Sequence, residues 1–515
     1  MRATRRALAL AAAMAVAAGC GRRPDATAGR GRRVAEAQAR LLAPSPDGAW
    51  LAWLERCAPP PARGLPADVA SCDLRVAPAS GGEVRRLVEG VTTLPAGLAW
   101  SPDGRALAAL ADYDYGSNAG GLVLWRPGGE VRRLAGSVGF YGFASSGDLW
   151  FVGGGQLYRV PPGAEPAPVA RAGSVATFDL GPPGTRWALA RRQVGAGGAL
   201  LVLRDGQVVA EVPGPVGDYG FSPAGDLVAF TVREQDGFAL RVGPAGPALA
   251  TAPAVGRRVQ SFGFSRDGSG LAWVADLQPG RAGDLWFAPA AAPRRGARVA
   301  PGVGEFRWAA AAPRLAWLQD FDPRVRSGTL AVAGAGMRPA VLGRNVTAYD
   351  LSPDGARVAY LEHVTAGGYS VDLRLGRAEA GSPAATVARG VFGFDFSPQG
   401  DQLYYRANCV RNAEGCDLFR VPAGGAEPGR PPERLAEGVK SFEFDRRRPE
   451  RLLVTWARRD LVALDLAVWE QGKLVAVDRG ALPGSAAFLG PDGSRLAYVV
   501  ADPKRAGVYV AELPR

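Results

Sequence analysis

Short apolar runs alternate with turns rich in Ser, Pro, Asp and Gly along almost the whole chain. The segment beginning at Ser45 reads SPDGAWLAWL, and similar segments begin at Ser101 (SPDGRALAAL) and Ser352 (SPDGARVAYL). Ser first, Pro second and Gly fourth fit a type I turn. The apolar run after each turn has the length of a buried β-strand. The pattern therefore predicts one turn-and-strand unit that the chain repeats many times.

Aligning the chain on this turn gives eleven copies, 36 to 56 residues apart, which begin at positions 45, 101, 145, 181, 222, 265, 311, 352, 397, 445 and 490. A short strand, often ending in an aromatic residue, precedes each turn. A strand of the form Leu-Ala-aromatic, a loop and two further strands follow it. Four antiparallel strands in a repeat of this length form the blade of a β-propeller. We predict an all-β protein with about eleven four-stranded blades.

The most regular turns are predicted to have a structural role. They contain Pro46, Asp47 and Gly48; Pro102, Asp103 and Gly104; Pro353, Asp354 and Gly355; and Pro491, Asp492 and Gly493. With its SPDG turn, its LAY-like strand and a later DLW or DLF strand, the repeat resembles that of TolB-like propellers, also called PD40 or WD40-like repeats. This resemblance extends from about residue 32 to residue 515. It implies a propeller fold, a place in the bacterial cell envelope and a binding role.

The chain differs from TolB itself, which has an α/β domain before its propeller, so no functional residue is carried over. Propellers typically have four to eight blades, fewer than eleven. The last repeat ends after its third strand, and the segment before the first turn looks like a fourth strand. We predict two tandem propellers, residues 31–250 with about five blades and residues 251–515 with about six. One large ring is the alternative.

The N-terminus has the features of a bacterial lipoprotein signal peptide. Arg2, Arg5 and Arg6 precede an apolar run, Ala7 to Ala17, which is much shorter than the roughly 20 residues of a membrane-spanning helix. The run leads through AAGC to Cys20, although Ala17 stands where such signals usually have Leu. We expect residues 1–19 to be removed, Cys20 to carry lipid and residues 20–30 to form a tether. A plain secretory signal is the alternative.

Composition changes this picture little. The net charge is +12, but arginine makes up 58 of the 61 basic residues, and no block of five or six like charges occurs. Solvated surface arginines explain the charge, so we expect no nucleic-acid partner. The chain has one histidine, His363, and no G-x-S-x-G or zinc-binding motif. We therefore expect no catalytic residue, no cofactor and no metal site, although loops at Asp112 and Asp320 have oxygen ligands suited to calcium.

The other four cysteines occupy matched positions in two repeats. Cys57 and Cys409 follow the second strand of the first and ninth repeats, and Cys72 and Cys416 open the third strand. Each pair therefore spans one hairpin loop, where Cα atoms come within bridging distance. We predict the disulfides Cys57–Cys72 and Cys409–Cys416, as expected of an exported protein.

These observations favour a non-catalytic binding scaffold. We expect a lipoprotein anchored to the outer membrane, facing the periplasm or the cell surface, that binds an envelope protein or a glycan. The alternative is a polysaccharide lyase or hydrolase that uses Arg, Tyr and carboxylates in the propeller channel. Clustered Asp and Glu with Arg and Tyr at the channel mouth would favour the enzyme.

Overall fold

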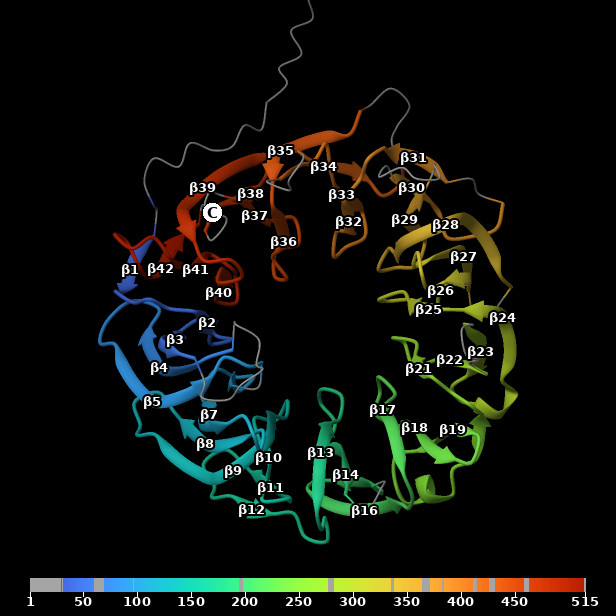
Figure 1. Ribbon diagram of the computed structural model, residues 1–515, viewed down its shortest axis with the longest axis horizontal. Coiled ribbons are helices and arrows are strands. Elements are labelled where there is room, and N and C mark those ends of the chain that lie inside the picture. Colours follow the sequence, from blue (N-terminus) through green and yellow to red (C-terminus); the bar gives the residue numbers. More distant parts are fainter. Residues whose placement is uncertain are drawn as a thin grey trace, which may run out of the picture.

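The chain forms a single ring of β-sheets around a central axis (Figure 1). The computed structural model describes residues 29, 31–59, 69–95, 97–193, 198–276, 282–334, 338–363, 371–381, 384–410, 415–425, 431–457 and 463–513. Within them, the sheets divide into eleven four-stranded blades, in which consecutive strands pair antiparallel. The predicted all-β propeller is confirmed. In this part of the chain, no helix has the length and apolar character needed to cross a bilayer.

The first five blades are assembled from consecutive strands. Blade 1 contains β2 (Leu41–Pro44), β3 (Trp50–Ala58), β4 (Ser71–Pro78) and β5 (Arg85–Thr92); blade 2 contains β6 (Leu98–Trp100), β7 (Leu107–Asp114), β8 (Ala119–Trp125) and the start of β9 (Arg132–Phe143); blade 3 contains the end of β9, β10 (Leu149–Gly153), β11 (Gln156–Val160) and β12 (Ala167–Pro168); blade 4 contains β13 (Val175–Leu180), β14 (Trp187–Arg192), β15 (Leu200–Arg204) and β16 (Gln207–Val212); blade 5 contains β17 (Val216–Phe221), β18 (Leu227–Glu234), β19 (Gly237–Pro244) and β20 (Ala254–Gly256).

The later blades follow the same order. Blade 6 contains β21 (Ser261–Phe264), β22 (Gly270–Ala275), β23 (Gly283–Pro289) and β24 (Ala297–Val303); blade 7 contains β25 (Glu305–Trp308), β26 (Leu315–Asp322), β27 (Ser327–Ala333) and the start of β28 (Ala340–Leu351); blade 8 contains the end of β28, β29 (Arg357–His363), β30 (Val371–Arg377) and β31 (Ala385–Ala388); blade 9 contains β32 (Gly393–Phe396), β33 (Gln402–Ala407), β34 (Cys416–Pro422) and β35 (Glu433–Val439); blade 10 contains β36 (Ser441–Phe444), β37 (Leu452–Ala457), β38 (Leu464–Glu470) and β39 (Lys473–Ala481); blade 11 contains β40 (Ala487–Leu489), β41 (Arg495–Val500), β42 (Gly507–Glu512) and β1 (Arg32–Ala35). Two short 3-10 helices, η1 (Pro247–Thr251) and η2 (Pro293–Arg295), lie in loops.

The N-terminal strand closes the ring. β1 pairs antiparallel with β42, with Arg32 opposite Val510 and Ala35 opposite Val508. Blade 11 therefore takes three strands from the C-terminal end of the chain and its fourth from the N-terminal end, as the complementary ends of the repeat array predicted. The chain therefore forms one large ring, which was the alternative to two tandem propellers.

The preferred division into two propellers near residue 250 is therefore wrong. Blades 5 and 6, on either side of that position, share one core in which Leu240 and Val242 pack with Leu271 and Trp273. At the other end of the chain, Trp53 of blade 1 packs with Val508 of blade 11. Two separate rings would not contain the core between blades 5 and 6, and they would need a different partner for blade 1 than blade 11.

The hydrophobic core consists of interfaces between blades. In the described residues, eleven apolar clusters each join two neighbouring blades around the ring. The Leu-Ala-aromatic strand serves two interfaces at once, because side chains alternate across a sheet. Leu51 and Trp53 face blade 11, whereas Ala52 faces blade 2, and all three are fully buried. The small alanine lets the next blade approach closely.

Candidate functional site

The repeated turns lie on one face of the ring, which we call the turn face and define by the loops between the first and second strands of the blades. The Gly48 amide donates to the Ser45 carbonyl at 2.8 Å, and the Ser45 hydroxyl accepts from the Trp50 amide at 2.9 Å. Ser101 and Ser352 make the same two bonds in blades 2 and 8. A hydrogen bond from the Ser101 hydroxyl lowers the pKa of Asp103. The turns therefore stabilise the start of each second strand.

The turn glycines also join neighbouring blades. Gly48 has a φ of 70°, and a Cβ placed on it would lie 2.2 Å from the Gly490 amide nitrogen of blade 11. A Cβ on Gly400 would lie 2.9 Å from Pro353 in blade 8. Glycine is needed at these turns because it permits a positive φ and leaves room for the neighbouring turn.

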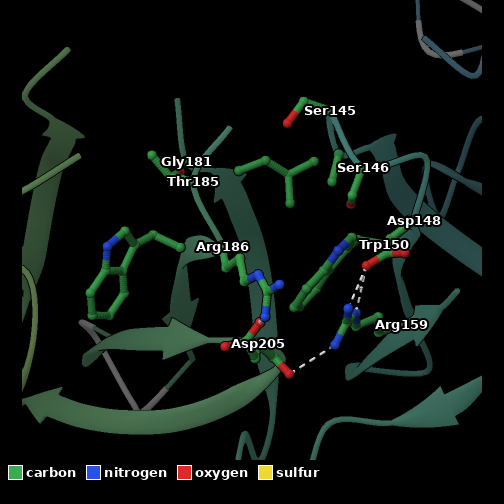
Figure 2. Close-up of a pocket in the computed structure, with 12 residues that line it drawn as sticks. Ser145, Ser146, Asp148, Trp150, Arg159, Gly181, Thr185, Arg186 and Asp205 are labelled. Atoms are coloured by element: carbon green, nitrogen blue, oxygen red, sulfur yellow. Dashed lines mark hydrogen bonds and ion pairs between the residues drawn. The ribbon is translucent and has the colours of Figure 1, made fainter. Parts of the chain in front are cut away.

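The series of turn contacts is interrupted at blades 3 and 4. A Cβ on Gly147, in the blade 3 turn, would meet only Pro162 of the same blade, at 3.6 Å. Gly184, in the blade 4 turn, has a φ of 83°, and a Cβ there would meet nothing within 4 Å. The two turns approach instead through a hydrogen bond of 3.2 Å from the Gly184 amide to the Ser145 hydroxyl. A cavity of about 280 Å³ opens beside this contact (Figure 2). Its lining residues are Ala144, Ser145, Ser146, Asp148, Trp150, Arg159, Leu180, Gly181, Thr185, Arg186, Trp187 and Asp205.

One wall of this cavity is held by an arginine that bridges the two blades. The Arg159 guanidinium contacts the carboxylate of Asp148 at 2.6 Å and donates to the backbone carbonyl of Asp205 at 2.8 Å. It also lies over the Trp150 ring, 5.8 Å from the centroid. Asp148 is buried, and a buried carboxylate needs a partner of opposite charge, which Arg159 provides. Figure 2 shows Arg159 between these partners.

The mouth of the cavity is more open. Arg186 pairs with the carboxylate of Asp205 at 3.2 Å, and their side chains are 78% and 45% exposed. Trp187 also borders the cavity, but its partly exposed side chain packs on the apolar core between blades 4 and 5. Accessible charged groups above an inner wall that is already ordered give a surface suited to binding a small ligand or a protruding side chain.

Sequence reasoning did not identify these cavity residues. The available signal was the departure of two consecutive turns from the common pattern, ASSG in blade 3 and GPPGTR in blade 4. The departure does not by itself predict the cavity, because the blade 4 turn still packs closely on its other neighbour: a Cβ on Gly225 of blade 5 would lie 2.9 Å from Thr185.

A second group of polar residues lies on the innermost strands. The last residue but one of the innermost strand is charged in blades 7 to 10, where it is Arg307, Asp350, Asp395 and Glu443. Burial raises the pKa of Asp350, and the Arg307 guanidinium opposes that rise. Desolvation and the negative charge of Asp350 both raise the pKa of Asp395. The Arg307 guanidinium lies over the ring of Tyr349, with its Cζ atom 5.6 Å from the ring centroid.

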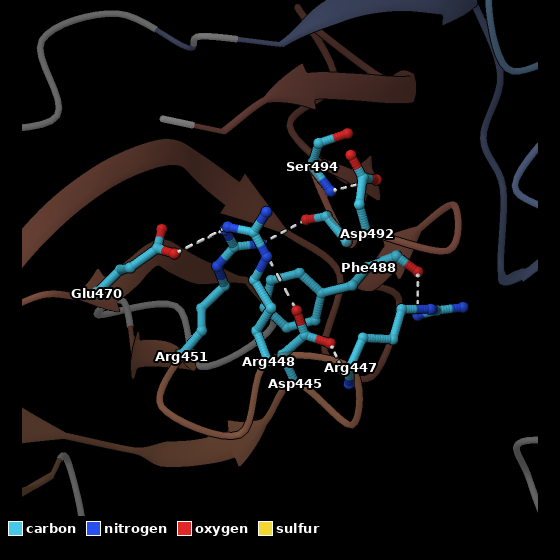
Figure 3. Close-up of polar contacts among 9 residues, drawn as sticks. Asp445, Arg447, Arg448, Arg451, Glu470, Phe488, Asp492 and Ser494 are labelled. Carbon is cyan, nitrogen blue, oxygen red and sulfur yellow. Dashed lines mark hydrogen bonds and ion pairs between the residues drawn. The ribbon is translucent and has the colours of Figure 1, made fainter. Parts of the chain in front are cut away.

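Blade 10 replaces its turn with a buried ion-pair cluster (Figure 3). The fully buried Arg451 donates to the Glu470 carboxylate at 2.8 Å and lies 3.5 Å from a carboxylate oxygen of Asp445. It also donates to the carbonyl of Gly493 in the blade 11 turn, which fastens the two blades together. Because its partners belong to the protein itself, this cluster has a structural role.

The predicted disulfides are both confirmed. Cys57 bonds to Cys72 and Cys409 bonds to Cys416, with Cα atoms 4.1 and 4.0 Å apart. Each bridge joins the end of a second strand to the start of the third, on the face opposite the turn face. Cys20 and the predicted signal peptide lie outside the described residues. Asp112 pairs with Arg133 at 3.1 Å. Among the described residues, no three side chains of His, Cys, Asp or Glu come together in a way that could hold a metal ion.

Comparison with known proteins finds distant likenesses among solved structures and no family. No family model matches the chain, and no curated protein matches it. The crystal structure of the eukaryotic initiation factor is 11% identical, covers 72% of this chain and 93% of its own, and has a TM-score of 0.42. The Dos1 propeller is 10% identical, with coverages of 64% and 92% and a TM-score of 0.35.

A third solved structure is an oligogalacturonate lyase in complex with manganese. It is 14% identical, covers 66% of this chain and 98% of its own, and has a TM-score of 0.31. Likenesses this distant carry no argument about function.

Proposed function

We propose that this protein is an exported, lipid-anchored, TolB-like β-propeller that acts as a non-catalytic scaffold, binding a protein or a glycan of the bacterial cell envelope. The cavity between blades 3 and 4 is the observation that carries the binding role. Its inner wall is built in advance by the Arg159 contacts, while Arg186 and Asp205 stay accessible at the mouth. A site that is already ordered binds without paying for the ordering of its own side chains.

Two features support export and anchoring. The basic residues, the short apolar run and AAGC precede Cys20, and the two disulfides suit an oxidising compartment. Gly21 follows the modified cysteine, which favours outer-membrane placement over retention in the inner membrane. Mass spectrometry of the mature N-terminus tests the anchor. We expect a chain that starts at a lipid-modified Cys20; an unmodified cysteine or another start would refute it.

The binding role is tested by site-specific photo-crosslinking in intact cells. We expect a photoreactive residue at Arg186 to form a discrete crosslink with an envelope protein or glycan. The matched control is Arg298 in blade 6, which also forms an exposed ion pair, at 2.7 Å with Asp284. Equal labelling from both positions, or none from Arg186, would argue against a binding site at this cavity.

The innermost strands support a second candidate, a polysaccharide lyase or hydrolase. Asp350 interacts with Arg307, and Asp395 interacts with Asp350 and Arg406; both carboxyls have raised pKa values, and the Arg307 guanidinium lies over Tyr349. These are the groups that acid–base chemistry on a polysaccharide would use. The test is release of fragments from purified envelope polysaccharides. Under this candidate, D350N and D395N each abolish release, whereas R298A, in an exposed ion pair of blade 6, leaves it unchanged. No release by the native protein would leave the scaffold as the proposal.

A further inference from the structure

We propose that the protein rests on anionic phospholipid with one edge of its ring, the outer rim of blades 10, 11 and 1. The inference rests on the proposed lipid anchor at Cys20 and names the surface of the protein that faces the membrane. It follows from the place where the chain leaves the ring, from the distance along the chain to Cys20, and from the charge of the outermost strands.

The chain leaves the ring at the outer edge of blades 10 and 11. Gly29 lies against Asp478 of β39, the outermost strand of blade 10, and against Arg505 of blade 11; a Cβ on Gly29 would lie 2.5 Å from the carboxylate and 2.7 Å from the guanidinium. Asp478 is buried and accepts hydrogen bonds of 2.8 Å from Arg505 and from the Tyr498 hydroxyl. An ordered cluster therefore fixes the exit point at the rim.

The chain between this exit and the lipid is short. Cys20 and Gly29 are nine positions apart, so even a fully extended chain spans at most about 32 Å. Neighbouring sheets pack about 10 Å apart, and eleven blades of four strands therefore form a ring about 50 Å across. If the opposite rim, at blades 5 and 6, rested on the bilayer, Gly29 would lie farther from the lipid than the chain reaches. An anchor at Cys20 therefore keeps blades 10 and 11 close to the membrane.

The outermost strands near the exit are basic. β39, β1 and β5, the outermost strands of blades 10, 11 and 1, follow one another along the rim (Figure 1). They contain six basic and two acidic residues, a net charge of +4. The outermost strands of the other eight blades, with β9 counted to Val138 and β28 to Val346, contain five basic and three acidic residues, a net charge of +2. Positive charge is therefore concentrated where the anchor holds the ring.

Three of these cations occupy matched positions. Arg32, Arg85 and Lys473 are each the first residue of an outermost strand, at the turn-face side of the rim, and all three are exposed. Arg32 and Arg85 donate to the backbone carbonyls of Ala79 and Gly129, at 3.2 and 2.8 Å. A neutral carbonyl does not cancel the charge of a guanidinium, so both side chains can still attract a phosphate group. Basic residues at a bilayer surface are attracted to anionic lipid in this way.

A ring lying flat on either face would also be within reach of the anchor, but the charge favours the edge. Surface charges act over only about 8 Å at physiological salt, so the cations must lie at the headgroups to contribute. In the edge-on orientation the ring axis runs parallel to the bilayer. The cavity between blades 3 and 4 is four blades away from the exit and stays clear of lipid, which leaves the turn face open to a partner.

The orientation is tested on the lipidated protein in vesicles of equal parts phosphatidylglycerol and phosphatidylcholine that carry a nitroxide quencher on some headgroups. A fluorescent residue replaces either of two exposed valines, Val84 just before β5 or Val341 in β28 of blade 7. We expect quenching at position 84 and none at position 341. Equal quenching would mean that the ring lies flat, and stronger quenching at position 341 would mean that another edge faces the bilayer; either result overturns the inference.

The cations are tested by charge reversal in the same vesicles. We expect R85E/K473E to lose most of the quenching at position 84, and added salt to weaken that quenching in the native protein. The matched control is R298E/R344E, which reverses two exposed arginines on the outermost strands of blades 6 and 7 and should keep the quenching. Quenching that survives R85E/K473E, or that both variants lose equally, would refute contact through the basic rim.

Mass spectrometry of the same preparation separates this inference from the proposed function. An unmodified Cys20 would refute the anchor, and the argument from reach would fall with it. A lipidated Cys20 without quenching at position 84 would refute the rim contact alone and leave the anchored scaffold in place.

Discussion

At the residue scale, the turn glycines explain why the chain repeats the same four residues. Gly48 and Gly128 both have a positive φ, 70° and 81°, but only Gly48 is in close contact with a neighbouring blade. We expect G128A to lower the free energy of unfolding by about 1 kcal/mol, from backbone strain alone. G48A should cost about 2–4 kcal/mol, because its Cβ would also collide with the Gly490 backbone. Chemical denaturation of both variants measures the difference, and equal losses would mean that turn contact contributes nothing.

The buried Arg451 gives a second contrast between similar residues. R451M would leave Asp445 and Glu470 buried with less compensation, so we expect it to destabilise the protein by about 3–5 kcal/mol. R448M removes a contact of 3.3 Å to the same Glu470, but the Arg448 side chain is 32% exposed. Its loss should cost less than about 1 kcal/mol. Thermal unfolding distinguishes the two variants; similar midpoints would show that the cluster is not needed to hold blades 10 and 11 together.

The raised pKa of Asp350 predicts a pH dependence of stability. A carboxyl whose pKa is higher in the folded than in the unfolded chain makes folding less favourable as pH rises through those values. D350N removes this penalty, so the variant should be more stable than the native protein at pH 7. The gain should vanish at a pH below the ordinary pKa of aspartate. Denaturation at several pH values provides the measurement, and a gain that is independent of pH would contradict the assigned cause.

At the element scale, the two disulfides constrain hairpins that are already paired. Glu55 lies opposite Asp73 and Ala58 opposite Ser71, on either side of the first bridge. Chain entropy assigns about 3 kcal/mol to closing a loop of 15 residues and about 2 kcal/mol to one of 7. We expect the variant C57S/C72S to lose at most the larger amount and C409S/C416S to lose less. Calorimetry of both variants checks this order. A larger loss for the shorter loop would mean that strain or packing, and not loop closure, controls the effect.

The elements were also the easiest part to predict from sequence. The turn and the strand after it depend on local chemistry, since Pro fixes one backbone angle and Gly permits another. The disulfides followed from matched positions within the repeat. The cavity was not predicted because it depends on how two neighbouring turns meet, here through the hydrogen bond from the Gly184 amide to the Ser145 hydroxyl and without close packing at Gly184. A change in the contact between blades leaves only an irregular turn in the sequence.

At the scale of the whole molecule, the number of rings could not be deduced from the repeats. Every blade presents similar apolar faces, so the same strands could close after five or six blades or after eleven. The choice depends on how far each blade rotates relative to the last one, which is set by side-chain packing such as that of Trp53 against Val508. What the sequence did contain was the complementarity of its ends, and the structure uses it once, where β1 joins β42.

This single closure predicts the effect of deleting residues 31–40, which include β1. The deletion removes the partner of β42 and leaves Val508, Tyr509 and Val510 on an open edge. Hydrogen exchange should therefore show lost protection first in β42 and then in β41, at the point where the ring opens. Residues 217–247, in blade 5, serve as the internal control, because blade 5 would complete a first ring of five blades if the chain formed two propellers. Loss of protection there, with β42 unchanged, would show that the ring does not close between the two ends of the chain.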